Sequence, residues 1–141
     1  AQPTAAAPTA KLVSPITTHV LDTCSGRPAE ALTITLFRKV PGTNGRGELW
    51  DEISTRATNK DGRIPDLMEP SDYCAPGQYR LTFQTGAYQF EMNKLHPGIY
   101  TMPPFYPTAS IDFEIAPHQA YEHFHVPLLF NPFGYSTYRG S

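Results

Sequence analysis

Residues 16–22 read Ile-Thr-Thr-His-Val-Leu-Asp and set a pattern that the rest of the chain repeats. Ile16, Thr18 and Val20 occupy alternate positions, so their side chains point to one side of an extended strand. His19 lies between them and points to the other side. The stretch therefore predicts a strand with one face in a core and a histidine on the opposite face.

The same two-residue period recurs at residues 31–38, 77–85 and 109–115, which we expect to be strands. Residues 49–58, a short segment that starts at Arg63, and residues 121–130 are further predicted strands. Turn-forming stretches separate them, including residues 59–63 with their Asp-Gly pair. Seven or eight short strands joined in this way indicate an all-β fold, an antiparallel β-sandwich. Residues 86–95 break the alternation and contain good helix formers, so they are the predicted short helix.

Pro127 interrupts the last of these predicted strands. Proline has no N–H to give to a strand ladder, so within sheets it normally occurs at edges or at bulges. The sequence therefore predicts that the strand over residues 121–130 lies at an edge of its sheet or carries a bulge near Pro127.

The composition is that of an ordinary globular protein. The 141 residues are 40% hydrophobic and 17% charged, and a chain of this length can fold without a metal or a disulfide. The formal net charge of −2 gives no electrostatic reason to expect nucleic acid or an anionic membrane as a partner. No apolar run approaches the roughly 18 residues that span a bilayer.

One domain accounts for most of the chain. We place it at residues 14–141 and expect residues 1–13, which are rich in alanine, proline and threonine, to form a disordered tail. The two cysteines, Cys24 and Cys74, belong to no CxxC pair or ligand cluster. We expect two free thiols, buried or half-buried, although a disulfide between them stays open.

Three histidines and an arginine are the candidate chemical groups. His123 and His125 are two residues apart on a strand, so they share a face, but no third ligand at a recognisable spacing supports a metal site. His19 and Arg63, taken singly, have the character of structural or surface residues. From the residues alone the chain is a β-sandwich without an assigned substrate.

Three stretches of the sequence resemble the transthyretin-related 5-hydroxyisourate hydrolases. Residues 123–141 read HFHVPLLFNPFGYSTYRGS, and the typical ending of that family is a His-aromatic-His-Val-Pro-Leu-Leu run that closes on Tyr-Arg-Gly-Ser. Residues 17–29 are similar to the first strand and turn of the family, and residues 59–63 to its central Asp-Gly-Arg turn. The resemblance extends over about residues 14–141.

This resemblance implies a fold, an assembly and a reaction. The fold is a transthyretin-like sandwich of two four-stranded sheets with one short helix. The assembly is a homotetramer, a dimer of dimers, with active sites in the channel where dimers meet. The reaction is the hydrolysis of 5-hydroxyisourate, the product of urate oxidation, to 2-oxo-4-hydroxy-4-carboxy-5-ureidoimidazoline, with no metal or organic cofactor.

The resemblance also assigns roles to individual residues. Imidazole titrates near neutral pH, so His19 and His125 can supply a base for water and a proton relay, and either can be the base. Arg63 supplies positive charge where a carbonyl oxygen turns anionic. The family pattern implies catalytic residues His19, Arg63, His125 and Ser141 and substrate-binding residues His19, Arg63, Tyr138, Arg139 and Gly140. On this interpretation the chain ends at Ser141 because its end is part of the active site.

Two alternatives remain at this point. A transthyretin-type carrier of small aromatic ligands has the same fold and channel, but the hormone carriers have a different C-terminal string and lack the matching His19, Arg63 and His125. A secreted structural or adhesion β-sandwich would form no symmetric tetramer. The sequence does not assign a cellular compartment. Cytoplasm and peroxisome suit the resemblance, although the last residues are not the peroxisomal signal Ser-Lys-Leu. The alanine-rich start would instead suit a cleaved export signal.

Overall fold

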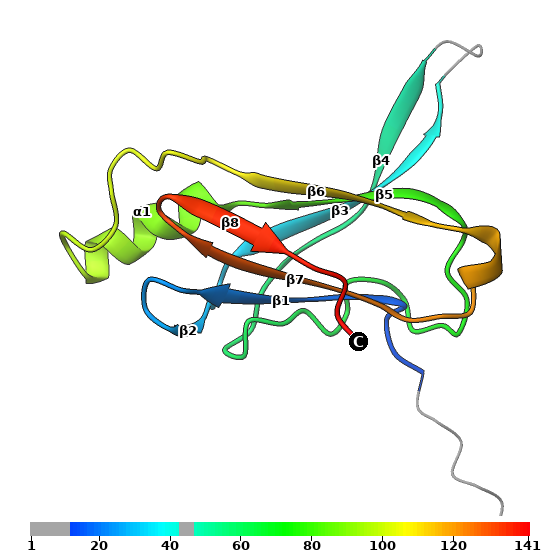
Figure 1. Ribbon diagram of the computed structural model, residues 1–141, viewed down its shortest axis with the longest axis horizontal. Helices are drawn as coiled ribbons and strands as arrows, with labels where there is room; N and C mark the ends of the chain where they lie inside the picture. Colours follow the sequence, from blue (N-terminus) through cyan, green and yellow to red (C-terminus); the bar gives the residue numbers. More distant parts are fainter. Residues whose placement is uncertain (1–11, 43–46) are drawn as a thin grey trace, which may run out of the picture.

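Two four-stranded sheets pack face to face in this computed structural model, which describes residues 12–42 and 47–141 (Figure 1). The first sheet consists, in spatial order, of β2 (Arg27–Pro28), β1 (Ile16–Asp22), β7 (Phe124–Asn131) and β8 (Gly134–Thr137). The second consists of β4 (Glu48–Ala57), β3 (Thr33–Pro41), β5 (Gly77–Phe83) and β6 (Ala109–Ile115). The predicted sandwich is thus confirmed, whereas the predicted tail lies outside the described residues except for residues 12 and 13.

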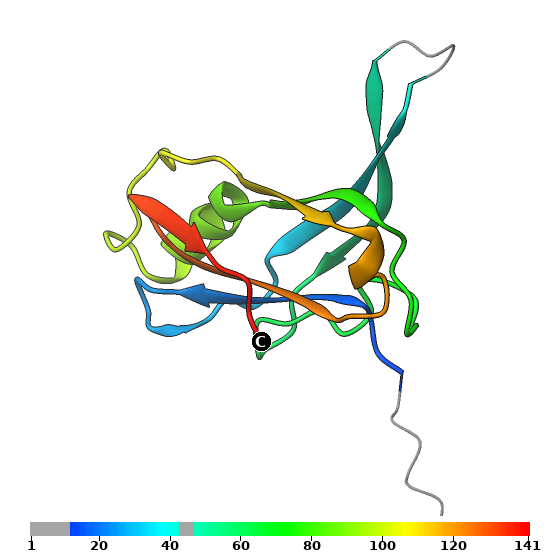
Figure 2. The ribbon, with the colours of Figure 1, turned by 45° about the vertical axis from the view of Figure 1, so that its right-hand side comes forward.

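Alternate side chains of both sheets fill the space between them. Ile16, Thr18 and Val20 of β1 are buried, and so are the predicted inward residues of β5, Tyr79, Leu81 and Phe83. β1 and β5 therefore bury the faces that the two-residue period predicts, whereas β4 is exposed along most of its length. The short strand predicted at Arg63 is an isolated bridge to His19 instead. The β3–β4 hairpin extends past the end of the sandwich (Figure 2).

The predicted helix is confirmed as α1 (Thr85–Leu95), which follows β5 directly and lies at one end of the sandwich (Figure 1). A short 3-10 helix, η2 (Pro117–Gln119), connects β6 to β7. Within residues 12–42 and 47–141, no helix is long and apolar enough to cross a membrane.

One strand pair departs from the predicted antiparallel pattern. β1 and β7 run parallel, with Thr17 opposite His125 and His19 opposite Pro127. The remaining pairs among the described strands are antiparallel. Because residues opposite each other in a pair of strands share a face, His19 and His125 both lie on the outer face of the first sheet.

Pro127 lies in a different position from the one that the sequence predicts. β7 is a central strand between β1 and β8, and its register with β1 runs without a bulge. The proline is tolerated because the β8 ladder ends at the pair of Leu128 with Thr137, so the missing N–H falls just beyond it. The Pro127 carbonyl oxygen accepts a hydrogen bond from the Thr137 hydroxyl at 2.7 Å.

A buried carboxylate ties the end of β1 to α1 and the loop after it. Asp22 is fully buried, and its Oδ2 accepts hydrogen bonds from the hydroxyls of Tyr88, at 2.9 Å, and Tyr100. Its Oδ1 accepts the N–H of Cys24 at 2.9 Å. Burial, and then these hydrogen bonds to Asp22, raise the pKa of both tyrosines far above the ordinary value. The two hydroxyls thus remain donors to Asp22.

Asp22→Ala should lower the free energy of unfolding by about 3 kcal/mol, because it leaves two buried tyrosine hydroxyls without an acceptor. Urea unfolding followed by far-ultraviolet circular dichroism, at one protein concentration, measures the loss. Asp112→Ala is the control, since Asp112 pairs with Arg80 at a more exposed site, where an ion pair is worth about 0–1 kcal/mol. Equal losses in the two variants would contradict the role of Asp22.

Candidate functional site

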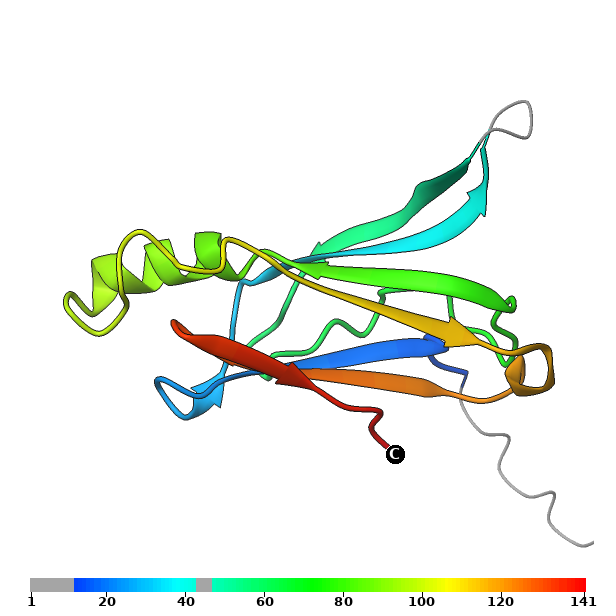
Figure 3. The ribbon, with the colours of Figure 1, turned by 45° about the horizontal axis from the view of Figure 1, so that its top comes forward.

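The outer face of the first sheet carries the candidate site. His19 of β1 and His125 of β7 point outward there, and each is half-buried. Isolated backbone bridges extend the sheet on both sides, from His19 to Arg63 and from His125 to Gly140. Figure 3 shows the chain end on the side of the first sheet that faces away from the second. The structure therefore brings together three chain segments that the sequence analysis selected separately.

Hydrogen bonds within the turn before Arg63 fix its shape. Asn59 Oδ1 accepts the N–H groups of Asp61 and Arg63 at 2.9 and 3.0 Å. The Gly62 carbonyl accepts the N–H of Val20 at 2.9 Å. Gly62 has a φ of 73°, and a Cβ there would lie 2.5 Å from the Val20 carbonyl oxygen, so the close approach requires glycine. The turn therefore holds Arg63 against the edge of β1.

The C-terminal segment resumes the pairing with β7 after the interruption at Pro127. The N–H of Gly140 donates to the His125 carbonyl at 2.8 Å. A Cβ on Gly140 would lie 2.6 Å from Cδ2 of the His125 ring. The backbone of Gly140 therefore packs against the imidazole and restricts where the ring can lie. Ser141 follows directly and is exposed.

The two histidines share one electrostatic environment with Arg63. Burial lowers the pKa of His19, the charge of Arg63 lowers it further, and Asp61 opposes both effects more weakly. Burial likewise lowers the pKa of His125, followed by the charges of Arg63 and His19. Both pKa values fall below the ordinary 6.5, so both imidazoles are neutral at pH 7, the form that can accept a proton.

Thr17 is a polar neighbour of His125 that the sequence analysis did not select. Its Oγ1 lies 2.8 Å from His125 Nδ1. The two residues are direct partners in the parallel β1–β7 register. The sequence carried one signal, a threonine two residues before His19 on the same strand face, but its contact with His125 depends on a register that alternation does not reveal.

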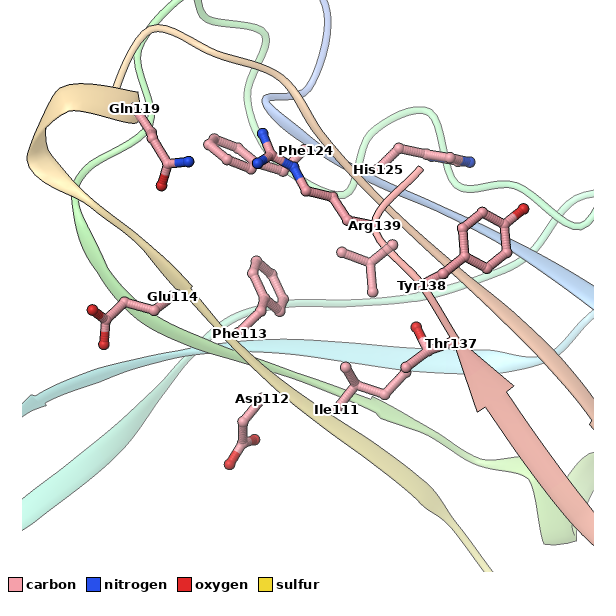
Figure 4. Close-up of a pocket in the computed structure, with 11 residues that line it drawn as sticks. Ile111, Asp112, Phe113, Glu114, Gln119, Phe124, His125, Thr137, Tyr138 and Arg139 are labelled. Atoms are coloured by element: carbon pink, nitrogen blue, oxygen red, sulfur yellow. The ribbon is translucent and has the colours of Figure 1, made fainter. Parts of the chain in front are cut away.

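Tyr138 and Arg139 line a cavity of about 240 Å³ beside the histidine face (Figure 4). The Arg139 guanidinium lies over the Phe124 ring, 5.1 Å from guanidinium carbon to ring centroid, and its Nη2 is 3.6 Å from Glu122 Oε1. The lining residues are Ile111, Asp112, Phe113, Glu114, Gln119, Phe124, His125, Val126, Thr137, Tyr138 and Arg139. His125 thus lies on the outer face and also contributes to the lining of this cavity.

Neither a disulfide nor a cluster of metal-ligating side chains is found among the described residues. Both cysteines are free thiols; Cys74 is buried, as predicted, whereas Cys24 is exposed and differs from the prediction. In the part of the chain that the structure describes, no three His, Cys, Asp or Glu side chains gather closely enough to hold a metal ion.

Sequence relatives share most of this chain. Residues 16–140 match the model of the HIUase/Transthyretin family. The 5-hydroxyisourate hydrolase of Mus musculus is 42% identical over 128 residues, which are 91% of this chain and 96% of that protein. The uric acid degradation bifunctional protein TTL of Arabidopsis thaliana is 43% identical over 132 residues, 90% of this chain. The match spans 37% of the length of that protein.

Solved structures confirm the transthyretin-like sandwich. The 5-hydroxyisourate hydrolase of Klebsiella pneumoniae superposes with a TM-score of 0.66 at 34% identity, covering 89% of this chain and 97% of that one. Sea bream transthyretin in complex with thyroxine superposes with a TM-score of 0.71 at 27% identity, covering 90% and 95%. The fold by itself therefore does not separate a hydrolase from a thyroxine-binding protein, and the side chains of the site must do so.

Gly140→Ala should displace the His125 ring and lower the free energy of unfolding by about 1–3 kcal/mol, because the new methyl group has no room. Imidazole NMR signals of His125 and thermal unfolding measure the two effects. Gly134→Ala is the matched control, since a Cβ there meets nothing within 4 Å. A Gly140→Ala variant with unshifted His125 signals would contradict the packing of Gly140 against the His125 ring.

Arg63→Gln should raise the pKa of both His19 and His125. The guanidinium opposes a second positive charge on either imidazole, so its removal makes protonation easier. As the pH is lowered, any activity that needs a neutral imidazole should then begin to fall at a higher pH than it does in the wild-type protein. NMR titration of the histidines measures the shift, with Arg80→Gln, on the second sheet, as the control. Unchanged histidine titrations in Arg63→Gln would refute the coupling.

Proposed function

Because the chain belongs to the HIUase/Transthyretin family, we propose that it is a 5-hydroxyisourate hydrolase that acts in urate degradation. The observation that carries this proposal is the outer face of the first sheet, where His19 and His125 lie near the permanent charge of Arg63. The proposed product is 2-oxo-4-hydroxy-4-carboxy-5-ureidoimidazoline. It forms when water opens the six-membered ring at an amide bond.

Each of these groups suits one need of amide hydrolysis. A neutral imidazole accepts a proton from water as the oxygen attacks the ring carbonyl. The Arg63 guanidinium stabilises the negative charge that develops on the carbonyl oxygen. The imidazolium then returns the proton to the ring nitrogen as the carbon–nitrogen bond breaks. One water is consumed, and the protein ends the cycle in its starting protonation state.

The C-terminal segment provides the rest of the proposed site. Gly140 brings the chain close to His125 without a side chain, and the Ser141 hydroxyl follows at the next position. Tyr138, which is 59% exposed, is available to a bound ring as a wall and a hydrogen-bond donor. Arg139 lies over Phe124 and lines the adjoining cavity. The proposed binding role of Arg139 is therefore to contact substrate from the side of that cavity.

A carrier of small aromatic ligands is the second candidate, since sea bream transthyretin with bound thyroxine superposes well on this chain. Carriage requires no proton transfer. Two imidazoles held neutral beside a guanidinium are therefore the feature that favours hydrolysis over carriage.

We also propose that the protein assembles as a homotetramer, a dimer of dimers, which sedimentation analysis would test.

The decisive assay follows the ultraviolet absorbance of 5-hydroxyisourate made from urate by urate oxidase, with and without this protein. We expect a much faster decay with the protein. His19→Ala and His125→Ala should each reduce the rate by about 100-fold or more while thermal stability changes little, because each removes a proton-transfer group. His118→Ala, at an exposed position on η2, is the control.

Two outcomes would count against the proposal. Decay that is unchanged by the folded wild-type protein would exclude the hydrolase and direct attention to ligand binding. Loss of folding in His19→Ala or His125→Ala would assign that histidine a structural role instead of a chemical one.

A further inference from the structure

We propose that Thr17 is a positioning residue for His125: the Thr17 hydroxyl orients the imidazole by accepting the Nδ1 proton, which leaves Nε2 free to act as the base. The inference rests on the proposed hydrolase function, because it assigns to His125 a proton-transfer role. It concerns a residue outside the set of histidines, arginine and closing residues that the sequence selected.

The backbone fixes Thr17 beside His125. The two residues face each other in the parallel register of β1 and β7, and the Oγ1 to Nδ1 distance is 2.8 Å. Threonine is branched at Cβ, so its hydroxyl has few rotamers available within a strand. Gly140 packs against Cδ2 of the same ring. The ring is therefore held by the Thr17 hydroxyl at one atom and by the Gly140 backbone at another.

The contact leaves one ring nitrogen for chemistry. Nδ1 is engaged by Thr17, so Nε2 is the nitrogen that can exchange a proton with water or substrate. When Nε2 takes a proton from water, Nδ1 keeps its own proton and donates it to the Thr17 oxygen. When Nε2 gives that proton to the leaving ring nitrogen, the Thr17 bond is unchanged. No other proton acceptor is needed in this sequence.

A hydroxyl suits this task because its oxygen has two lone pairs. It can therefore accept the Nδ1 proton both before and after Nε2 is protonated. It is also neutral. A carboxylate at the same place would raise the pKa of His125, whereas here burial and the charges of Arg63 and His19 lower it. Thr17 thus orients the ring without favouring the imidazolium.

Thr17→Val tests the proposal, because valine preserves the branched shape and removes the hydroxyl. We expect kcat to fall by about 10- to 100-fold, with little change in KM, since the ring loses its orientation but the binding groups remain. Thr17→Ser keeps a hydroxyl and should recover most of the rate. In the protein without substrate, nitrogen-15 NMR of His125 should show a changed Nδ1 shift in Thr17→Val.

Thr18→Val is the matched control. Thr18 is the next residue on β1, and its hydroxyl donates to the Val126 carbonyl at 2.7 Å on the inner face of the same strand pair. This variant should lose stability but keep both the kcat of the folded protein and the His125 nitrogen shifts. The control therefore distinguishes the general effect of losing a hydroxyl between β1 and β7 from the specific effect of losing the hydroxyl that contacts His125.

The two proposals fail in distinguishable ways. If Thr17→Val keeps the wild-type kcat and nitrogen shifts, the positioning role is overturned. If Thr17→Val and Thr17→Ser lose rate and melting temperature together, Thr17 is structural, and the role is again overturned. If the wild-type protein does not hydrolyse 5-hydroxyisourate, the proposed function falls, and with it the role of Thr17 in that reaction, whatever the His125 nitrogen shifts show.

Discussion

The parallel pairing of β1 with β7 is the constraint on which the candidate site depends. It joins two strands from opposite ends of the chain, residues 16–22 and 124–131, into the middle of one sheet. Opposite residues of paired strands share a face, so this register places Thr17, His19 and His125 on the outer side while their neighbours enter the core. A slip of one residue in either strand would bury its histidine.

Two glycines complete the site from the edges of that strand pair. At Gly62 the chain passes so close to β1 that a side chain would collide with the Val20 carbonyl, and at Gly140 a side chain would collide with the His125 ring. A polar residue follows each glycine in the sequence: Arg63 follows Gly62, and Ser141 follows Gly140. The outer face thereby gathers groups from three parts of the chain onto a rigid sheet, where packing and backbone hydrogen bonds restrict their motion.

The fold supports more than one function, so it does not by itself decide between them. The chain superposes on a thyroxine-bound transthyretin as well as on a 5-hydroxyisourate hydrolase. On the outer face of this chain, burial and the charge of Arg63 lower the pKa of His19 and His125, which favours the neutral imidazole, the form that can act as a base. The buried Asp22, at the end of β1, has a structural role: it ties the sheet to α1 through the Tyr88 hydroxyl and to the loop after α1 through the Tyr100 hydroxyl.

Sequence by itself determined the local structure, because the two-residue period follows directly from the geometry of a strand with one buried face. Most of the strands, α1 and the outward direction of His19 were predictable for this reason. β2 and β8 lie outside the predicted strands, and the direction of His125 was not predicted. The family resemblance added Arg63 and the closing residues. Only the tertiary structure decided that β1 and β7 are parallel, that Pro127 lies in a central strand, that Arg139 packs over Phe124 and that Thr17 contacts His125. Each of these depends on which distant segments pair and in what register, and the alternation within one strand carries no information about its partner.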